Sequence, residues 1–154
     1  MELLKRITST DKDFKALVVL LDEDLAQRDG EDNAFYAQYN SIVQLKHCVA
    51  FYLDDIPVAC GAFKPFDETT IEVKRMFVLP GHRGKSIASK VLNELELWAK
   101  ELNYSSSILE TGLRQPEAIA LYKKNGYMII QNYPPYEDIE NSVCFKKTLR
   151  TNIP

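Results

Sequence analysis

The feature that most constrains the fold is a junction between a strand-like run and an amphipathic helix, at residues 78–88. Before it, residues 71–79 are rich in β-branched and apolar side chains, which is typical of a strand. After it, apolar residues recur at helical spacing, so one face of a helix is expected to be buried. That face consists of Ile87, Val91, Leu95, Trp98 and Leu102. The pattern predicts a strand, a glycine-containing turn and a helix in direct succession.

The turn between these two elements is small and basic. A helix that begins in such a turn leaves several backbone N–H groups unpaired at its N-terminus. Together with the helix dipole, these groups form an anion site that commonly binds phosphate. Arg83 and Lys85 add positive charge. The junction therefore predicts a site for a phosphorylated cofactor, and the alternative is a solvated surface turn.

The glycine pattern narrows the class of cofactor. A P-loop requires a glycine five residues before Gly84, where the chain has Leu79, and the three spaced glycines of a dinucleotide-binding turn are missing. The residues instead resemble the acyl-CoA signature of the GCN5-related N-acetyltransferases (GNAT), Arg/Gln-x-x-Gly-x-Gly/Ala. The matching run is Arg83-Gly84-Lys85-Ser86-Ile87-Ala88. Ser86 stands where the family usually has glycine, and its hydroxyl is a further donor for a phosphate oxygen.

A second stretch, residues 115–127, resembles the family's Asn-x-x-Ala-x-x-Leu-Tyr-x-x-x-Gly-Phe/Tyr helix and turn. Gln115 replaces the usual Asn, and a strand-like segment separates the two motifs. The resemblance covers residues 70–133 closely and the remainder more loosely. It implies a single GNAT domain over residues 1–154. The implied fold is α/β, with a mixed, mostly antiparallel sheet of about six to seven strands flanked by four helices.

The hydrophobic pattern of the whole chain agrees with that α/β order. Strands are expected at residues 3–8, 47–53, 58–64, 70–79, 107–110, 127–131 and 143–148. Besides the helix after the junction, one helix is expected to follow Thr10 as its N-cap. Two more are expected at residues 34–45 and 116–125. Residues 26–33 are polar and contain Gly30, which predicts a loop.

Composition excludes several classes of protein. A net charge of −3 argues against a nucleic-acid binder, and no apolar run approaches the ~20 residues that span a bilayer. The first residues lack the apolar region of a signal peptide. Cys48, Cys60 and Cys144 lack Cys-x-x-Cys spacing and the two histidines lie far apart, so no metal is expected. We expect a reduced, cytoplasmic protein without nucleic-acid or membrane partners, as a monomer or a homodimer.

The resemblance implies acetyl-CoA as the cofactor and a primary amine of a small molecule as the acceptor, joined in a ternary complex. A protein or peptide amine is an alternative acceptor, and a non-catalytic acyl-CoA-binding module is an alternative function. In the family, backbone amides at the end of the fourth strand bind the thioester carbonyl and the pantetheine arm. Here these are the amides of Met76 and Val78. The implied cofactor-binding residues are Met76, Phe77, Val78, His82, Arg83, Gly84, Lys85, Ser86, Ile87, Ala88, Gln115 and Tyr122.

Two side chains are candidates for proton transfer. The resemblance implies Tyr122 as the acid that protonates the leaving thiolate, with a half-buried packing role as the alternative. Glu72 is the candidate base, and strand alternation is expected to place it on one face with Met76 and Val78. Its alternative is a surface pair with Lys74, in which case the proton would leave by another route, such as a water chain or Glu110 on the neighbouring strand. An acidic segment within residues 22–32 is a candidate wall of the acceptor site, and its alternative is a solvated helix end and loop. An aromatic turn at residues 133–136 is a second candidate wall, and its alternative is a connector to the last strand.

Overall fold

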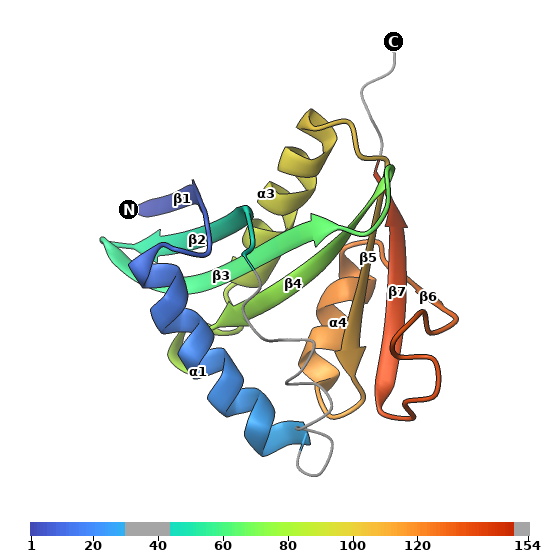
Figure 1. The fold of residues 1–154 in the computed structure, drawn as a ribbon. Helices are drawn as coiled ribbons and strands as arrows, with labels where there is room; N and C mark the ends of the chain where they lie inside the picture. Colours follow the sequence, from blue (N-terminus) through green and yellow to red (C-terminus); the bar gives the residue numbers. More distant parts are fainter. Residues whose placement is uncertain (30–43, 150–154) are drawn as a thin grey trace.

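The computed structural model describes residues 1–29 and 44–149, and its strands form one seven-stranded sheet (Figure 1). The sheet order is β1-β2-β3-β4-β5-β7-β6. The strands are β1 (Glu2–Ile7), β2 (His47–Leu53), β3 (Ile56–Pro65), β4 (Thr70–Val78), β5 (Ser106–Gly112), β6 (Met128–Ile130) and β7 (Ser142–Thr148). Neighbouring strands are antiparallel except β4 and β5, which are parallel. The predicted mixed, mostly antiparallel sheet is confirmed.

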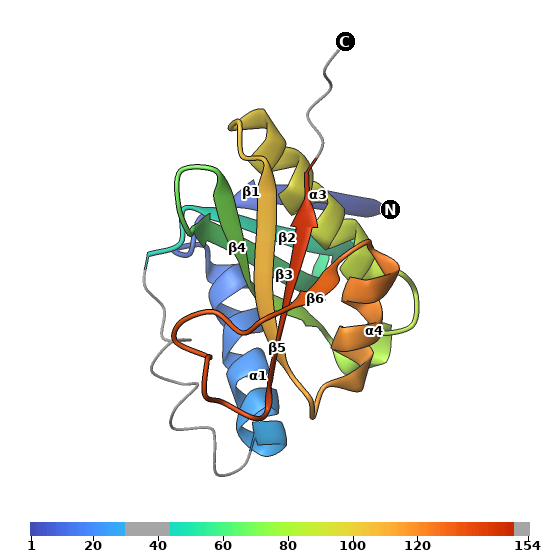
Figure 2. The same cartoon turned by 90° about the vertical axis from the view of Figure 1, so that its right-hand side faces the viewer.

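The helices lie on both faces of this sheet. They are α1 (Lys12–Asp29), α3 (Ile87–Glu101), α4 (Pro116–Lys124) and the short 3₁₀ helix η2 (Pro80–His82). Figure 2 shows α1 on one side of the sheet and α3 and α4 on the other. The described residues thus contain three of the four expected α-helices. The fourth, expected at residues 34–45, lies outside the described residues except for its last two positions, which are not helical.

Each face of the sheet has its own apolar core. On one face, Val91, Leu92 and Leu95 of α3 are fully buried in a cluster that includes side chains of β2 to β5 and β7. On the other, Phe14, Leu17 and Val18 of α1 are buried in a separate cluster with residues of β2 to β4. The helical periodicity after the junction therefore identified the buried face of α3, except that Leu102, which was expected on that face, follows the last residue of the helix and is 44% exposed.

The boundaries of α1 differ from the prediction at both ends. Its N-terminal amides are capped by Asp11, whose Oδ1 accepts hydrogen bonds from the amides of Asp13 (2.9 Å) and Phe14 (3.0 Å), so the prediction of Thr10 was wrong. The helix also continues through residues 26–29, which were expected to be loop. Arg28 stabilises this last turn, because its guanidinium pairs with Asp24 one turn earlier and with Glu117 of α4.

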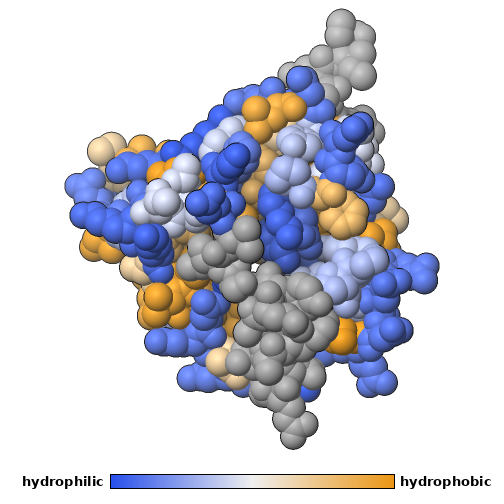
Figure 3. Space-filling view, in the orientation of Figure 1, coloured by the Kyte–Doolittle hydropathy of each residue, from blue (hydrophilic) through white to orange (hydrophobic). Residues whose placement is uncertain are grey.

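The α1 face of the molecule is mostly hydrophilic (Figure 3). Outside the grey atoms, its hydrophobic residues form separate spots rather than one continuous patch. Val19 and Leu20 are the large apolar side chains of α1 that are exposed. Among the described residues, no helix combines the length and apolar character needed to cross a membrane. Cys48, Cys60 and Cys144 are all buried free thiols.

The parallel pair at the centre of the sheet is short, and this positions the candidate site. β4 and β5 are paired at only three positions, Thr70–Ser106, Ile71–Ser107 and Glu72–Ile108. Beyond them β4 stays paired with β3 and β5 stays paired with β7, so the sheet opens between its two halves. Figure 1 shows the two strands side by side at one end and apart at the other. Because the two strands are parallel and paired only near their N-termini, their C-terminal residues lie at the open end.

Candidate active site

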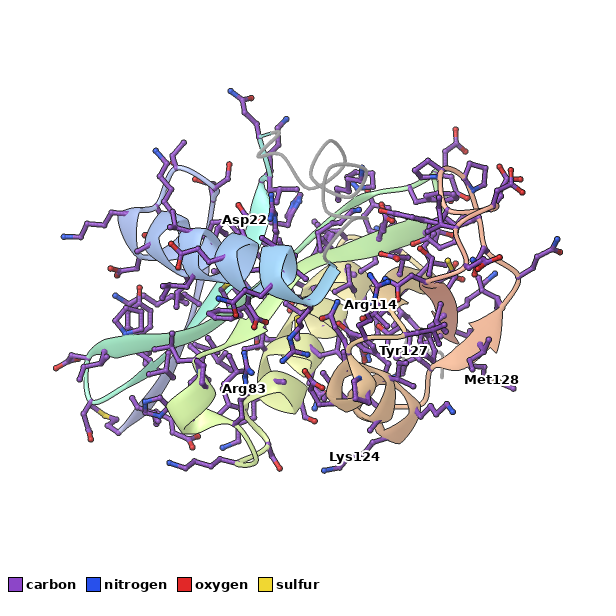
Figure 4. The ribbon with its side chains drawn as sticks, turned by 90° about the horizontal axis from the view of Figure 1, so that it is seen from below. Asp22, Arg83, Arg114, Lys124, Tyr127 and Met128 are labelled. Atoms are coloured by element: carbon purple, nitrogen blue, oxygen red, sulfur yellow. The ribbon has the colours of Figure 1, made fainter. Side chains whose placement is uncertain are left out.

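A cavity of about 520 Å³ lies where β4 and β5 separate. Its walls come from the C-terminal halves of both strands, the turn after β4, the first turn of α3, helix α4, and the α1 residues Leu21, Asp24 and Leu25. Figure 4 views this open end from below, with α1 and Asp22 on one side and the turn with Arg83 on the other. The cavity therefore joins the predicted phosphate turn to the space under α1.

The turn after β4 has the backbone conformation that an anion site requires. Gly84 has φ +80° and Ser86 has φ +63°, both in the left-handed region. The amides of Gly84, Lys85, Ser86, Ile87 and Ala88 donate to no acceptor in residues 1–29 and 44–149. A Cβ added at Gly84 would meet nothing within 4 Å, so the backbone there is open to a ligand. Glycine adopts a left-handed φ without steric cost, and this explains why the family usually has glycine at the position of Ser86.

Arg83 holds the turn against the end of β4. Its Nε donates to the carbonyl oxygen of Val78 (2.9 Å), and its guanidinium lies 5.7 Å from the centre of the Phe77 ring. Its Nη2 is 3.8 Å from Asp24 of α1. The amide of Arg83 donates to Pro80 O (3.4 Å), so it is not among the unpaired amides. Arg83 thus brings charge to the rim of the cavity with a fixed side-chain direction.

The end of β4 also has an amide that faces the opening. The amide of Leu79 donates to Val58 O of β3 (2.9 Å). Because successive amides of an antiparallel strand point to opposite sides, the amide of Val78 points away from β3. On that side β5 is no longer paired with β4, so we infer that this amide faces the cavity. This orientation agrees with the role that the resemblance implied for Val78.

A β-bulge in β4 changes which side chains share a face. Lys74 pairs with Ala62 and Phe77 with Cys60, so two residues of β4, at positions 75 and 76, oppose one residue of β3. The first of them, Arg75, has φ +60°. Val73, Met76 and Val78 consequently lie on the α3 face. The prediction that Glu72 shares a face with Met76 and Val78 was therefore wrong, because it assumed uninterrupted alternation.

Glu72 lies in a buried polar cluster beside the cavity rather than in its lining. The residue is 4% exposed, and its Oε2 accepts a hydrogen bond from Tyr133 Oη (2.8 Å). Lys74 Nζ lies 3.5 Å from Glu72 and donates to Tyr136 Oη (3.1 Å). Burial, partly offset by the Glu72 charge, lowers the pKa of Lys74. Glu72 therefore pairs with Lys74, as the alternative to the base role predicted, but the pair is buried and does not lie on the surface.

Tyr122 of α4 and Glu110 of β5 both line the cavity. Tyr122 is 6% exposed, and its ring packs against those of Tyr127 and Phe145. Burial, reinforced by the Glu110 charge, raises the pKa of Tyr122 above its ordinary value. Glu110 lines the cavity and accepts a hydrogen bond from Ser142 Oγ (2.7 Å). A phenol that stays protonated and a carboxylate thus lie in one cavity.

The structure brings most of the predicted site residues to this cavity. Those that line it are Met76, Phe77, Val78, His82, Arg83, Gly84, Ser86, Ile87, Ala88, Gln115 and Tyr122. In the described part of the chain, Glu72, Lys85 and the aromatic turn at residues 133–136 are not in the lining. Of the acidic segment, Asp24 lines the cavity, while its residues 31 and 32 lie outside the described residues. No group of three metal-ligating side chains occurs within the two described ranges.

Sequence reasoning missed Lys74 and Arg75 as cavity residues and considered Glu110 only as a secondary route for the proton. One signal for the bulge was available. The apolar residues of β4 that pack on the α3 face change parity, from Ile71 and Val73 to Met76 and Val78. A strict two-residue period cannot bury both pairs on one face, so the change indicates an inserted residue. Nothing comparable in the sequence indicated that Glu110 faces the cavity.

Comparison with known proteins agrees with this geometry. The family model of the acetyltransferase (GNAT) family matches residues 14–127. An IAA acetyltransferase of Azospirillum brasilense is 39% identical over 93 residues, which is 60% of this chain and 61% of that protein. A probable N-acetyltransferase 14 of Xenopus tropicalis is 35% identical over 59% of this chain and 45% of its own length. The matched regions thus span about half to three fifths of the length of these two relatives.

Solved structures give a fuller overlap. A Klebsiella pneumoniae protein assigned as an acyl-CoA N-acyltransferase superimposes with a TM-score of 0.81 at 31% identity, over 97% of this chain and 99% of that one. A GNAT acetyltransferase of Elizabethkingia anophelis with acetyl-CoA bound has a TM-score of 0.68 at 16% identity, over 96% and 98% of the two chains, which shows the shared fold. Since the family model covers most of the sequence and the fold agrees, the chain belongs to the GNAT acetyltransferase family.

Proposed function

We propose that residues 1–154 form one acetyl-CoA-dependent N-acetyltransferase domain that acetylates a primary amine of a small molecule by direct attack in a ternary complex. The observation that carries the proposal is the cavity between β4 and β5 with the unpaired amides of the turn after β4 at its rim. Family membership supports the reaction class, and relatives with the same fold have been solved with acetyl-CoA or coenzyme A bound.

The residues present fit coenzyme A. The open backbone at Gly84 and the free amides at the start of α3 suit a pyrophosphate, and Arg83 adds a fixed positive charge. His82 Nδ1 is buried without a hydrogen-bond partner among the described residues, which leaves it for a ligand. In this proposal the amide of Val78, a residue of the cavity lining, binds the pantetheine arm. When bound, acetyl-CoA supplies an activated thioester for attack by the amine.

Tyr122 is proposed as the acid that protonates the leaving thiolate. Its raised pKa keeps the phenol protonated at neutral pH, so its proton is available to the leaving group. The proton on the attacking amine needs an acceptor, and two carboxylates are candidates. Glu110 lines the cavity, whereas Glu72 is held by Tyr133 and Lys74 beside it. This placement favours Glu110 over Glu72 as the acceptor of the proton.

A small-molecule acceptor is supported by the cavity, whose volume is within the range of small-ligand sites. We also propose a cytoplasmic location, because three buried free thiols suit a reducing compartment. A homodimer stays a prediction, and light scattering would test it by measuring the molar mass in solution. The proposed function is tested by incubating the protein with acetyl-CoA and a pooled panel of amines, amino acids and peptides, with mass-spectrometric detection of acetylated products.

Acetylation of a small amine supports the proposal, while acetylation of peptides alone would assign the protein or peptide alternative. Saturable stabilisation by coenzyme A with no product from any pool would favour the binding module. The Tyr122→Phe variant is the internal control, because a binding module does not need the hydroxyl. If the variant forms product at the parent's rate, with chemistry shown to limit turnover, Tyr122 has a packing role only.

A further inference from the structure

The bulge in β4 places a buried guanidinium in the cavity. Arg75 is 8% exposed and lines the cavity together with Lys74. Its left-handed φ of +60° costs backbone free energy, which the fold tolerates at this position. The carbonyl oxygen of Arg75 accepts a hydrogen bond from Cys60 Sγ of β3 (3.4 Å), and this bond holds the bulge against β3. The side chain therefore enters the space under α1 from a fixed backbone.

The hydrogen bonding of Arg75 is incomplete. Its Nη1 donates to Asp22 Oδ1 of α1 at 2.5 Å, and Figure 4 labels Asp22 on this helix. Its Nη2 is buried and has no hydrogen-bond partner among the described residues. Buried donors in folded proteins nearly always have a partner, and a charged donor is the costliest to leave unpaired. Because Arg75 lines the cavity, an acceptor for this buried N–H would come from a ligand bound there.

The neighbouring charges make Arg75 the suitable partner for an anion. Lys74 is balanced by Glu72 at 3.5 Å and by the nearby charge of Glu110. Arg83 contacts Asp24, which also pairs with Arg28. Within residues 1–29 and 44–149, Arg75 pairs with one carboxylate, that of Asp22, whose side chain is 52% exposed and thus partly hydrated. The planar fork of a guanidinium can bind a second carboxylate with its remaining N–H groups.

We propose that the acceptor is an amine that also carries a carboxylate, as amino acids do, and that Nη2 of Arg75 binds this carboxylate. The inference rests on the proposed acetyltransfer function and names the acceptor class for it. Arg75 lies on β4 and Glu110 on β5, so the two ends of such an acceptor would meet opposite charges across the cavity. Arg75 is then a specificity-determining residue, separate from the turn that binds the cofactor.

The test uses matched acceptors that differ only in the carboxylate: an amino acid, its carboxamide and its decarboxylated amine. We expect kcat/KM of the parent to be at least about 10-fold higher for the carboxylate form. In Arg75→Met, the KM of the carboxylate acceptor should rise about 10- to 100-fold. The KM values for the carboxamide and for acetyl-CoA should stay unchanged. Arg6→Met is the matched control, because it removes a guanidinium that lies on β1 outside the cavity lining.

A binding measurement separates this proposal from the proposed function. Simple carboxylic acids without an amine are titrated calorimetrically into the protein with coenzyme A bound, so no turnover is needed. Binding that is lost in Arg75→Met and partly kept in Arg75→Lys supports the carboxylate site even if no amine is acetylated. Retained coenzyme A binding shows that each variant is folded. Equal use of carboxylate and carboxamide acceptors, or equal binding of the acids by parent and Arg75→Met, would overturn the proposal.

Discussion

Replacing Gly84 with valine separates the backbone requirement of the turn from its role in ligand binding. Gly84 has φ +80°, and a non-glycine residue in the left-handed region costs about 1–2 kcal/mol. A Cβ at this position meets no atom within 4 Å, so no steric clash adds to that cost. For a chain of 154 residues, the melting temperature should fall by about 2–8 °C. The fold should survive this loss.

The effect on coenzyme A binding should be much larger than the effect on stability. The new side chain would stand beside the unpaired amides at the start of α3, in the space that the pyrophosphate needs. At a ligand concentration of about 100 times Kd, the parent should be stabilised by about 2.7 kcal/mol, or about 5–11 °C. Gly84→Val should lose this shift. The assay is a thermal melt with and without coenzyme A.

Gly126 provides the matched control. It follows α4, has φ +91°, and a Cβ there would contact only the Lys147 side chain at 3.6 Å or more. Gly126→Val should therefore lower the melting temperature by a similar amount and keep the coenzyme A shift. If Gly84→Val keeps the shift as well, the turn does not bind the pyrophosphate and the reasoning from the unpaired amides fails.

Further predictions concern proton transfer, pH and the thiols. Tyr122→Phe should leave coenzyme A binding unchanged and lower kcat about 100-fold; an unchanged kcat would contradict the acid role. Burial raises the pKa of Tyr122 above its ordinary value of 10.0, so the phenol stays protonated to higher pH than a free tyrosine. Deprotonation of Tyr122 should therefore cause no fall in the parent's rate between pH 7 and 10. Glu110→Gln should lower kcat at pH 7 more than Glu72→Gln does, with partial recovery at higher pH as free amine increases; the reverse order would return the base role to Glu72. Burial raises the pKa of Cys60 to about 12 and that of Cys144 to about 11, so their thiolates are scarce at pH 7; a thiol reagent should modify them only after unfolding, and rapid labelling of the native protein would refute their burial.

Much of the fold could be predicted because local signals determine it. The apolar periodicity after residue 86 requires one buried helix face, and the structure has Ile87, Val91 and Leu95 buried on it. The strand–turn–helix junction and the glycine at position 84 likewise follow from backbone requirements that a short sequence specifies. These features depend on residues close together in the chain, so sequence patterns are sufficient to identify them.

The features that could not be predicted depend on long-range contacts. The extra turn of α1 is stabilised by Arg28 with Glu117, which is 89 residues away in sequence. Glu72 is buried because Tyr133, from a segment 61 residues later, covers it. The bulge at Arg75 broke the alternation on which the base assignment relied, and only the parity change of the apolar residues indicated it. Such contacts have no local pattern, so the positions of the carboxylates required the structure.

The central claim is that this cavity transfers an acetyl group from acetyl-CoA to an amine. The most direct measurement follows released thiol and acetylated amine in the same reaction, with the best acceptor from the panel. We expect one acetylated amine per thiol released, and loss of both in Gly84→Val but not in Gly126→Val. Thiol release without acetylated amine, or equal product formation by Gly84→Val and the parent, would contradict it.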